Sequence, residues 1–122
     1  MANQITELSG IKAVIEFETK QGRTKCERVS KCGYDLVTST IDGADERHIE
    51  VKATSKDRFT FRWLEELEQQ AAWQDERFYL YLVTGAGTKK ARVLIYDRTM
   101  LSERFSKVIT HYQYVFPRSD FQ

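Results

Sequence analysis

Three residues in the first half of the chain have the types and spacing of a metal-dependent hydrolytic site. Glu50 and Lys52 lie one residue apart in the segment HIEVKAT, and Asp35 opens the preceding β-forming run. Because strand side chains alternate between two faces, Glu50 and Lys52 would share a face, with their roots about 6.5–7 Å apart. In an antiparallel hairpin, Asp35 would lie beside the far end of the second strand, near Lys52. The spacing therefore predicts one patch with two carboxylates and an ammonium.

Metal-assisted phosphodiester hydrolysis is the chemistry that suits this patch. A hard cation such as Mg²⁺, or Mn²⁺ in its place, takes a few oxygen ligands and retains several waters. The carboxylates of Asp35 and Glu50 and the backbone carbonyl of Val51 would supply such ligands. Lys52 would orient the attacking water or stabilise the charge that develops on the phosphate. The alternative is an exposed surface pair, which is the commonest fate of such charges and contributes little to stability.

A helix is expected over residues 10–21, with Ser9 as its N-cap and Gly22 as its C-terminal stop. Its buried stripe, at helical spacing, consists of Ile11, Val14 and Ile15. The next step of this stripe is Glu18. A carboxylate at a core position is costly unless it is paired or binds a metal, so Glu18 is a candidate to face the patch. The alternative is that the helix emerges into solvent at Glu18.

The remaining pattern predicts a mixed α/β fold. Asp42-Gly43, between YDLVTST and ERHIEVKAT, signals a hairpin, and RTKCERVSKC is either irregular or holds a short strand. A second helix is expected in WLEELEQQAAW, where Glu68 is either an accessory acid or part of a solvated face. Strands in RFYLYLVTGA and KKARVLIYDR would flank a turn at Gly85–Lys90, and a short helix in TMLSERF and a strand in VITHYQYVF would follow. Helices and strands that interleave around one sheet indicate an α/β sandwich.

Length and overall composition narrow the possible functions less than these motifs do. A chain of 122 residues fits one domain, residues 1–122, and its net charge of +1 carries no global signature of nucleic-acid binding. No apolar run approaches a membrane span, and the N-terminus lacks the pattern of a secretory signal. Cys26 and Cys32 are therefore expected to be reduced thiols of a cytoplasmic protein, with a disulfide as the alternative.

A local basic segment precedes the hairpin. It has only Glu27 as counter-charge and comprises Lys20, Arg23, Lys25, Arg28 and Lys31. Such a cluster would contact phosphates of a nucleic acid, which sets the register of binding without reading bases. The alternative is a solvated loop.

The stretch from Glu16 to Ser55 resembles a known family. The segments EFETKQGR, ERVS, GYDLVTS and ERHIEVKAT are similar to the NO VEIN-type C-terminal domain family, which is often fused to helicases and ATPases. That family resembles the PD-(D/E)XK restriction-endonuclease-like superfamily. Its pattern of an acid before Gly-Arg, then Val-Ser, Gly-Tyr-Asp and Ile-Glu-Val-Lys corresponds here to Glu18, Gly22-Arg23, Val29-Ser30, Gly33–Asp35 and Ile49–Lys52. A looser similarity of ELEQQAAW to a Glu-x-x-Ala helix points to Glu68, and the resemblance covers about residues 13–84.

The resemblance implies a restriction-endonuclease-like αβββαβ core, a mixed central sheet flanked by helices, with the active-site hairpin at its centre. It implies Asp35 and Glu50 as ligands of Mg²⁺ or Mn²⁺ and Lys52 as the catalytic lysine. Glu18 would complete the acidic shell, directly or through water. The implied activity is hydrolysis of DNA in defence or repair.

A second class of function stays open beside the nuclease. No helicase or ATPase module is attached in this sequence, so the domain would act alone or find such a partner in trans. A catalytically silent nuclease-like fold would instead serve as a nucleic-acid or protein-interaction module. The near-zero net charge and the small size favour the module, whereas a homodimer would double the surface available for gripping DNA.

Overall fold

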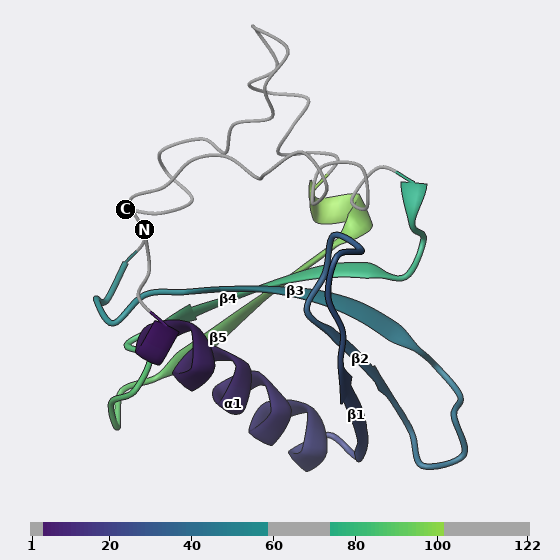
Figure 1. Cartoon of the computed structure of the whole chain (residues 1–122), viewed down its shortest axis with the longest axis horizontal. Coiled ribbons are helices and arrows are strands. Elements are labelled where there is room, and N and C mark those ends of the chain that lie inside the picture. Colours follow the sequence, from purple (N-terminus) through teal and green to yellow (C-terminus); the bar gives the residue numbers. More distant parts are fainter. Residues whose placement is uncertain (1–3, 59–73, 102–122) are drawn as a thin grey trace, which may run out of the picture.

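A computed structural model of the chain describes residues 4–58 and 74–101. Helix α1 (Gln4–Lys20) is followed by a five-stranded sheet with the strand order β1-β2-β3-β4-β5 (Figure 1). The strands are β1 (Lys25–Arg28), β2 (Leu36–Ser39), β3 (Arg47–Ala53), β4 (Phe78–Thr84) and β5 (Arg92–Asp97). Neighbouring strands are antiparallel except β3 and β4, which are parallel. A mixed α/β fold is confirmed.

Helix α1 begins earlier than the sequence pattern predicts. Ser9 lies inside the helix and does not cap it, because the preceding turn already consists of helix-compatible residues with an acid, Glu7, near the positive end of the helix dipole. The stop at Gly22 is confirmed by its positive φ of 84°. The amide of Gly22 donates to the Thr19 carbonyl over 3.0 Å, and that of Arg23 donates to the Glu18 carbonyl over 2.9 Å. This turn brings Arg23 back beside the last turn of α1.

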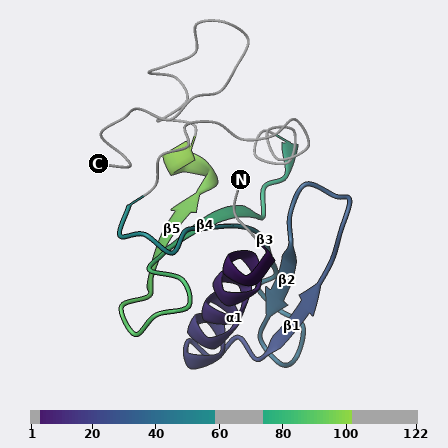
Figure 2. The same cartoon turned by 60° about the vertical axis from the view of Figure 1, so that its left-hand side comes forward.

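Helix α1 covers one face of the sheet and packs against β3, β4 and β5 (Figure 2). The core between the two layers is made of alternate strand residues and one turn of the helix: Val14, Leu36, Ile49, Val51, Tyr81 and Val83. Each of these side chains is buried, and full burial of an aliphatic or aromatic side chain contributes about 1.5–3 kcal/mol. Strand alternation then places the residues between them on the opposite face of the sheet.

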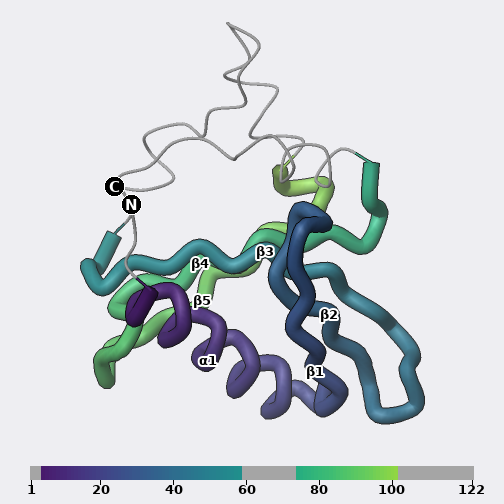
Figure 3. Tube along the Cα trace, in the orientation of Figure 1, coloured from purple at the N-terminus to yellow at the C-terminus, as the bar shows by residue number. Residues whose placement is uncertain are grey.

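The hairpin between β2 and β3 has a loop longer than two residues, as its sequence indicates. Its turn is closed by Asp42, whose Oδ1 accepts hydrogen bonds from the Thr40 hydroxyl over 2.5 Å and from the Ala44 amide over 3.1 Å. Gly43 and Asp45 both adopt positive φ, at 82° and 54°. Figure 3 follows the chain through this hairpin, whose tip lies at the opposite end of β2 from the β1–β2 connection. The polar segment before the hairpin holds the short strand β1.

Several expected elements fall outside the described residues. They are the helix in residues 63–73 with Glu68, the strand in residues 108–116, and most of the helix at 99–105, of which residues 98–101 are helical. The second helix of an αβββαβ core is among them, so the strand order alone is established here. In the described part of the chain, no helix is long and apolar enough to cross a membrane.

Gly10 lies where α1 closely approaches β3. A Cβ added at Gly10 would lie 2.4 Å from the Cβ of Ala53, so one of the two elements would have to move. Gly10→Ala should therefore lower the free energy of unfolding by on the order of 1 kcal/mol, since overpacking outweighs the better helix propensity of alanine. In an Ala53→Gly background the same change should be stabilising. Urea unfolding of the four proteins measures this change of sign, and a stabilising Gly10→Ala in the parent would contradict the close approach.

Candidate functional site

The register of the β2–β3 hairpin sets Asp35 and Glu50 against each other. Leu36 pairs with Ile49 and Val37 with His48, so one further step of the ladder puts Asp35 opposite Glu50. Partners in an antiparallel pair share a face of the sheet, and their side chains are neighbours. Leu36 and Ile49 pack toward α1, so the two carboxylates lie on the face away from the helix.

Two hydrogen bonds to the backbone of β3 hold Asp35 in place. Its amide donates to the Ile49 carbonyl over 2.8 Å, and its Oδ2 accepts from the Val51 amide over 2.9 Å. The carboxylate thus takes the place of a ladder partner just before β2 begins. The amide and carbonyl of one strand residue point to the same side, so the Val51 carbonyl is directed toward the side where Asp35 lies.

Glu50 and Lys52 form an ion pair on this face. Glu50 is only 5% exposed, and its Oε2 lies 3.5 Å from the Lys52 Nζ. A buried carboxylate is strongly disfavoured without a partner, and the ammonium supplies one. The Lys52 side chain is 24% exposed, so its charge is partly accessible from solvent. Asp35, Glu50 and Lys52 therefore gather on one face of one hairpin.

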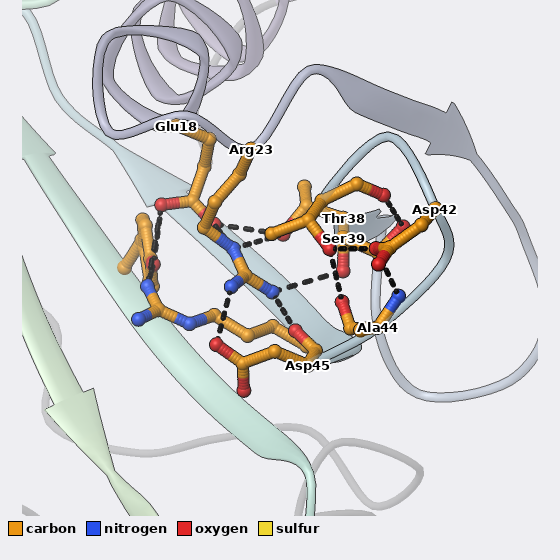
Figure 4. A network of polar contacts seen from close by, with 10 residues as sticks. Glu18, Arg23, Thr38, Ser39, Asp42, Ala44 and Asp45 are labelled. Atoms are coloured by element: carbon orange, nitrogen blue, oxygen red, sulfur yellow. Dashed lines mark hydrogen bonds and ion pairs between the residues drawn. The ribbon is translucent and has the colours of Figure 1, made fainter.

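Glu18 does not join them, which corrects its expected place in the acidic shell. Its carboxylate is fully buried on the α1 face, where Oε1 accepts from the Thr38 hydroxyl over 2.7 Å and Oε2 from the Tyr81 hydroxyl over 2.9 Å. Two guanidinium groups, of Arg23 at 3.2 Å and Arg47 at 3.3 Å, complete its surroundings (Figure 4). The presence of Glu18 in the buried stripe of the helix is therefore explained by its ion pairs with two arginines. Among the described residues, no group of three or more His, Cys, Asp or Glu side chains is arranged to hold a metal ion.

Arg23 is a structural residue, which corrects its expected role in binding phosphates. It is 3% exposed, and its guanidinium donates to Glu18, to the Thr38 carbonyl over 3.1 Å and to Asp45 Oδ2 over 2.8 Å. The four remaining basic candidates are exposed: Lys20, Lys25, Arg28 and Lys31. Pairing of Lys25 with Ser39 places it on the face of Asp35, whereas Arg28, opposite Leu36, is on the α1 face. The basic segment thus splits into an internal ion pair and a dispersed exposed set.

The hydroxyl of Tyr81 is locked between opposite charges. It accepts from Arg47 Nη1 over 2.7 Å and donates to Glu18. Burial, and next the negative charge of Glu18, raise the pKa of Tyr81 well above its ordinary value. The Arg47 guanidinium also lies 4.9 Å from the centre of the Tyr79 ring, while its buried Nε has no hydrogen-bond partner in the structure. Tyr81 therefore stays a neutral donor to Glu18 at any ordinary pH.

His48 lies on β3 beside the site and contacts two carboxylates and an aromatic ring. Its Nδ1 lies 2.5 Å from Asp75 and its Nε2 2.6 Å from Glu46, and its ring stacks on Tyr34 at 4.6 Å. Burial by itself lowers the pKa of His48, but the hydrogen bonds that its ring donates to Asp75 and Glu46 outweigh burial and leave the pKa raised. The imidazolium thus ties β3 to the residues before β4, on the face that carries Glu50.

The two cysteines are free thiols and do not form a disulfide. The Cys26 thiol donates to the Arg23 carbonyl over 3.4 Å, and the Cys32 thiol to the Tyr34 carbonyl over 3.6 Å. Burial, and next the charge of Glu18, raise the pKa of Cys26. A raised pKa keeps Cys26 in the thiol form, which is a poor nucleophile.

The contacts of His48 with Asp75 and Glu46 predict a defined pH dependence of stability. The pKa of His48 is raised in the folded state. The stability that protonated His48 contributes is therefore fully present below the pKa of the unfolded chain, about 6.5, and is lost as the pH rises through the pKa of the folded protein. Between pH 6 and pH 9 the free energy of unfolding of the parent should therefore fall more than that of His48→Gln. His111 is present in both proteins and cancels. Equal pH profiles in urea unfolding would show that the two carboxylates do not hold the imidazolium.

Comparison with known proteins places the chain in one family. The family model described as Protein NO VEIN, C-terminal, matches residues 6–96, which include α1 from Thr6 onward and the five strands as far as Tyr96. Comparisons with curated proteins and with solved structures gave no match. The matched range covers well over half of the chain and contains Asp35, Glu50 and Lys52, so the chain belongs to the family of the Protein NO VEIN C-terminal domain.

Proposed function

We propose that this chain is a Mg²⁺-dependent deoxyribonuclease of the PD-(D/E)XK type. The observation that carries the proposal is the hairpin register, which faces Asp35 against Glu50 and keeps Lys52 on the same side. Two acids from adjacent strands, with a lysine two residues after the second acid, form a compact set for phosphodiester hydrolysis. The resemblance of GYD and IEVK to that superfamily adds to this reading.

The residues present suit a hard divalent cation. Mg²⁺ is commonly held by one or two carboxylates and retains several waters, and Mn²⁺ accepts the same ligand types. Asp35 and Glu50 would hold the ion, with the Val51 carbonyl as a third oxygen. When bound, the ion would polarise a phosphoryl oxygen and lower the pKa of a water. The bond from the Val51 amide engages only Oδ2 of Asp35 and leaves Oδ1 for a further ligand.

Lys52 has two tasks in this proposal. Without a cation, its ammonium at 3.5 Å compensates the buried charge of Glu50 and so reduces the repulsion between the two acids. With substrate present, the same partly exposed ammonium would stabilise the negative charge that develops on the phosphate. A compact ammonium suits both tasks because it can move between partners on a flexible stem.

Recruitment of nucleic acid would rest on local charge. The net charge is only +1, so long-range attraction of DNA is weak. Lys25 lies on the face of the acids, and Lys31 lies in the β1–β2 connection that leads into Asp35, with a left-handed φ of 61°. These two lysines are the candidates for phosphate contacts, Lys31 close to Asp35 in the chain and Lys25 toward the tip of the hairpin, near Gly43. The choice of DNA, a role in defence or repair, and a helicase or ATPase partner in trans rest on the resemblance.

A catalytically silent interaction module is the second candidate. The observation that favours it is the withdrawal of Glu18 into the α1 face, which leaves two acids where the family resemblance implies three. In such a module the exposed lysines would bind nucleic acid or a protein, and the pair of Glu50 and Lys52 would serve stability alone.

Cleavage of DNA separates the two candidates. The parent should cleave single-stranded, duplex or branched DNA in Mg²⁺ or Mn²⁺, and Asp35→Asn should lower the rate by ~10²-fold or more. The amide of asparagine still offers an oxygen to the Val51 amide, so the hairpin should persist in circular dichroism. Asp57→Asn, at an exposed acid, is the matched control and should cleave like the parent. A parent that cleaves none of these substrates would leave the interaction module standing.

The role of Lys52 is tested by a side chain of similar length without charge. In single-turnover cleavage with excess metal, Lys52→Met should be slower than the parent by ~10²-fold or more, and Lys52→Arg should restore the rate only in part. Lys56→Met, at an exposed lysine three positions beyond the end of β3, is the matched control. The melting temperature in excess metal checks that each variant is folded. If Lys52→Met cleaves at the parent rate, the lysine has no part in the chemistry.

A further inference from the structure

We infer that Glu18 is a positioning residue, which clamps the β2–β3 hairpin in the register that sets Asp35 opposite Glu50. Its consequence for metal binding rests on the proposed function. The clamp itself is a property of the fold and can be measured without any metal or substrate.

One carboxylate bridges a cross-strand pair. Thr38 on β2 and Arg47 on β3 are direct partners in the ladder. Glu18 takes one of them on each oxygen: the Thr38 hydroxyl donates to Oε1 over 2.7 Å, and Arg47 Nη1 lies 3.3 Å from Oε2. The Tyr81 hydroxyl on β4 donates to Oε2 over 2.9 Å. Glu18 therefore ties three adjacent strands together from the face covered by α1.

The same pairing determines where the two candidate metal ligands lie. Asp35 is three residues before Thr38, and Glu50 is three residues after Arg47, so the two pairs belong to one antiparallel register. Three is an odd step, which puts the second pair on the opposite face of the sheet. A slip of the pairing by one residue would exchange the faces of one strand and separate the acids. A clamp on the α1 face thus fixes the geometry of the far face.

Burial makes this clamp selective for one register. Glu18 is 0% exposed, so a register that withdraws its donors would leave a buried carboxylate without partners, which is strongly disfavoured. Arg23 adds a second attachment, because its guanidinium donates to Glu18, to the Thr38 carbonyl and to Asp45 in the hairpin turn (Figure 4). The turn and the first strand of the hairpin are therefore both bound to the end of α1.

The test uses two variants of Thr38, one that removes the hydroxyl and one that keeps it. Thr38→Val keeps the shape and the strand propensity of threonine but loses the donor to Glu18, whereas Thr38→Ser keeps the donor. The reporter is amide hydrogen exchange of Val51, whose amide donates to Asp35, measured relative to Thr54, whose amide donates to Val83 in the same β3 region. A loss of global stability would speed both amides alike. Thr38→Val should raise the ratio of the Val51 rate to the Thr54 rate about tenfold, and Thr38→Ser should not.

Manganese affinity then connects the clamp to the site. Thr38→Val should bind Mn²⁺ about tenfold more weakly than Thr38→Ser, with Glu18→Gln as a second variant of the same clamp. Unchanged exchange ratios and unchanged Mn²⁺ affinity in Thr38→Val would overturn the inference. This outcome decides even if Glu18→Gln does not fold. A parent that binds no Mn²⁺ would refute the metal site of the proposed function, and the Val51 amide would still decide whether Glu18 holds Asp35 in place.

Discussion

The buried carboxylate of Glu18 is the interaction on which the rest of the structure depends. Its four partners come from four places in the chain: the turn after α1, β2, β3 and β4. A fully buried charge is tolerable only when every partner is present, so the network forms completely or not at all. The orientation of α1 on the sheet, the turn at Gly22 and the hairpin register are thereby coupled to one another.

The hairpin keeps its stabilising residues and its candidate site residues on opposite faces. Toward α1 it presents apolar side chains and the ladder pair of Thr38 and Arg47, all of them packed or paired. Away from α1 it presents Asp35, Glu50 and Lys52, which contribute little apolar burial. The two acids carry like charges, which a cation such as the ammonium of Lys52 offsets. Such a division lets acidic residues be held close together, because the free energy that keeps them there comes from the other face.

Local patterns predicted the hairpin, the Gly22 stop, the strands around Gly85 and the shared face of Glu50 and Lys52, because periodicity and turn chemistry act over a few residues. Such local patterns cannot identify the partners of Glu18, because Thr38 and Tyr81 lie 20 and 63 residues away in the sequence. The helix stripe does indicate that Glu18 needs a partner, but the sequence pattern does not distinguish a metal ion from a guanidinium group. Arg23 was assigned to phosphate binding for the same reason: composition records its charge, whereas only the turn at Gly22 shows its direction.

In the proposed function, Asp35 and Glu50 together hold a divalent cation. The most direct measurement is a crystal structure of the parent with Mn²⁺, with diffraction data collected for the anomalous signal of manganese. The account predicts an anomalous peak within bonding distance of both carboxylates, in a hairpin that keeps the bond from the Val51 amide to Asp35. A manganese ion bound elsewhere while this face stays empty, at a concentration that supports binding in solution, would contradict it.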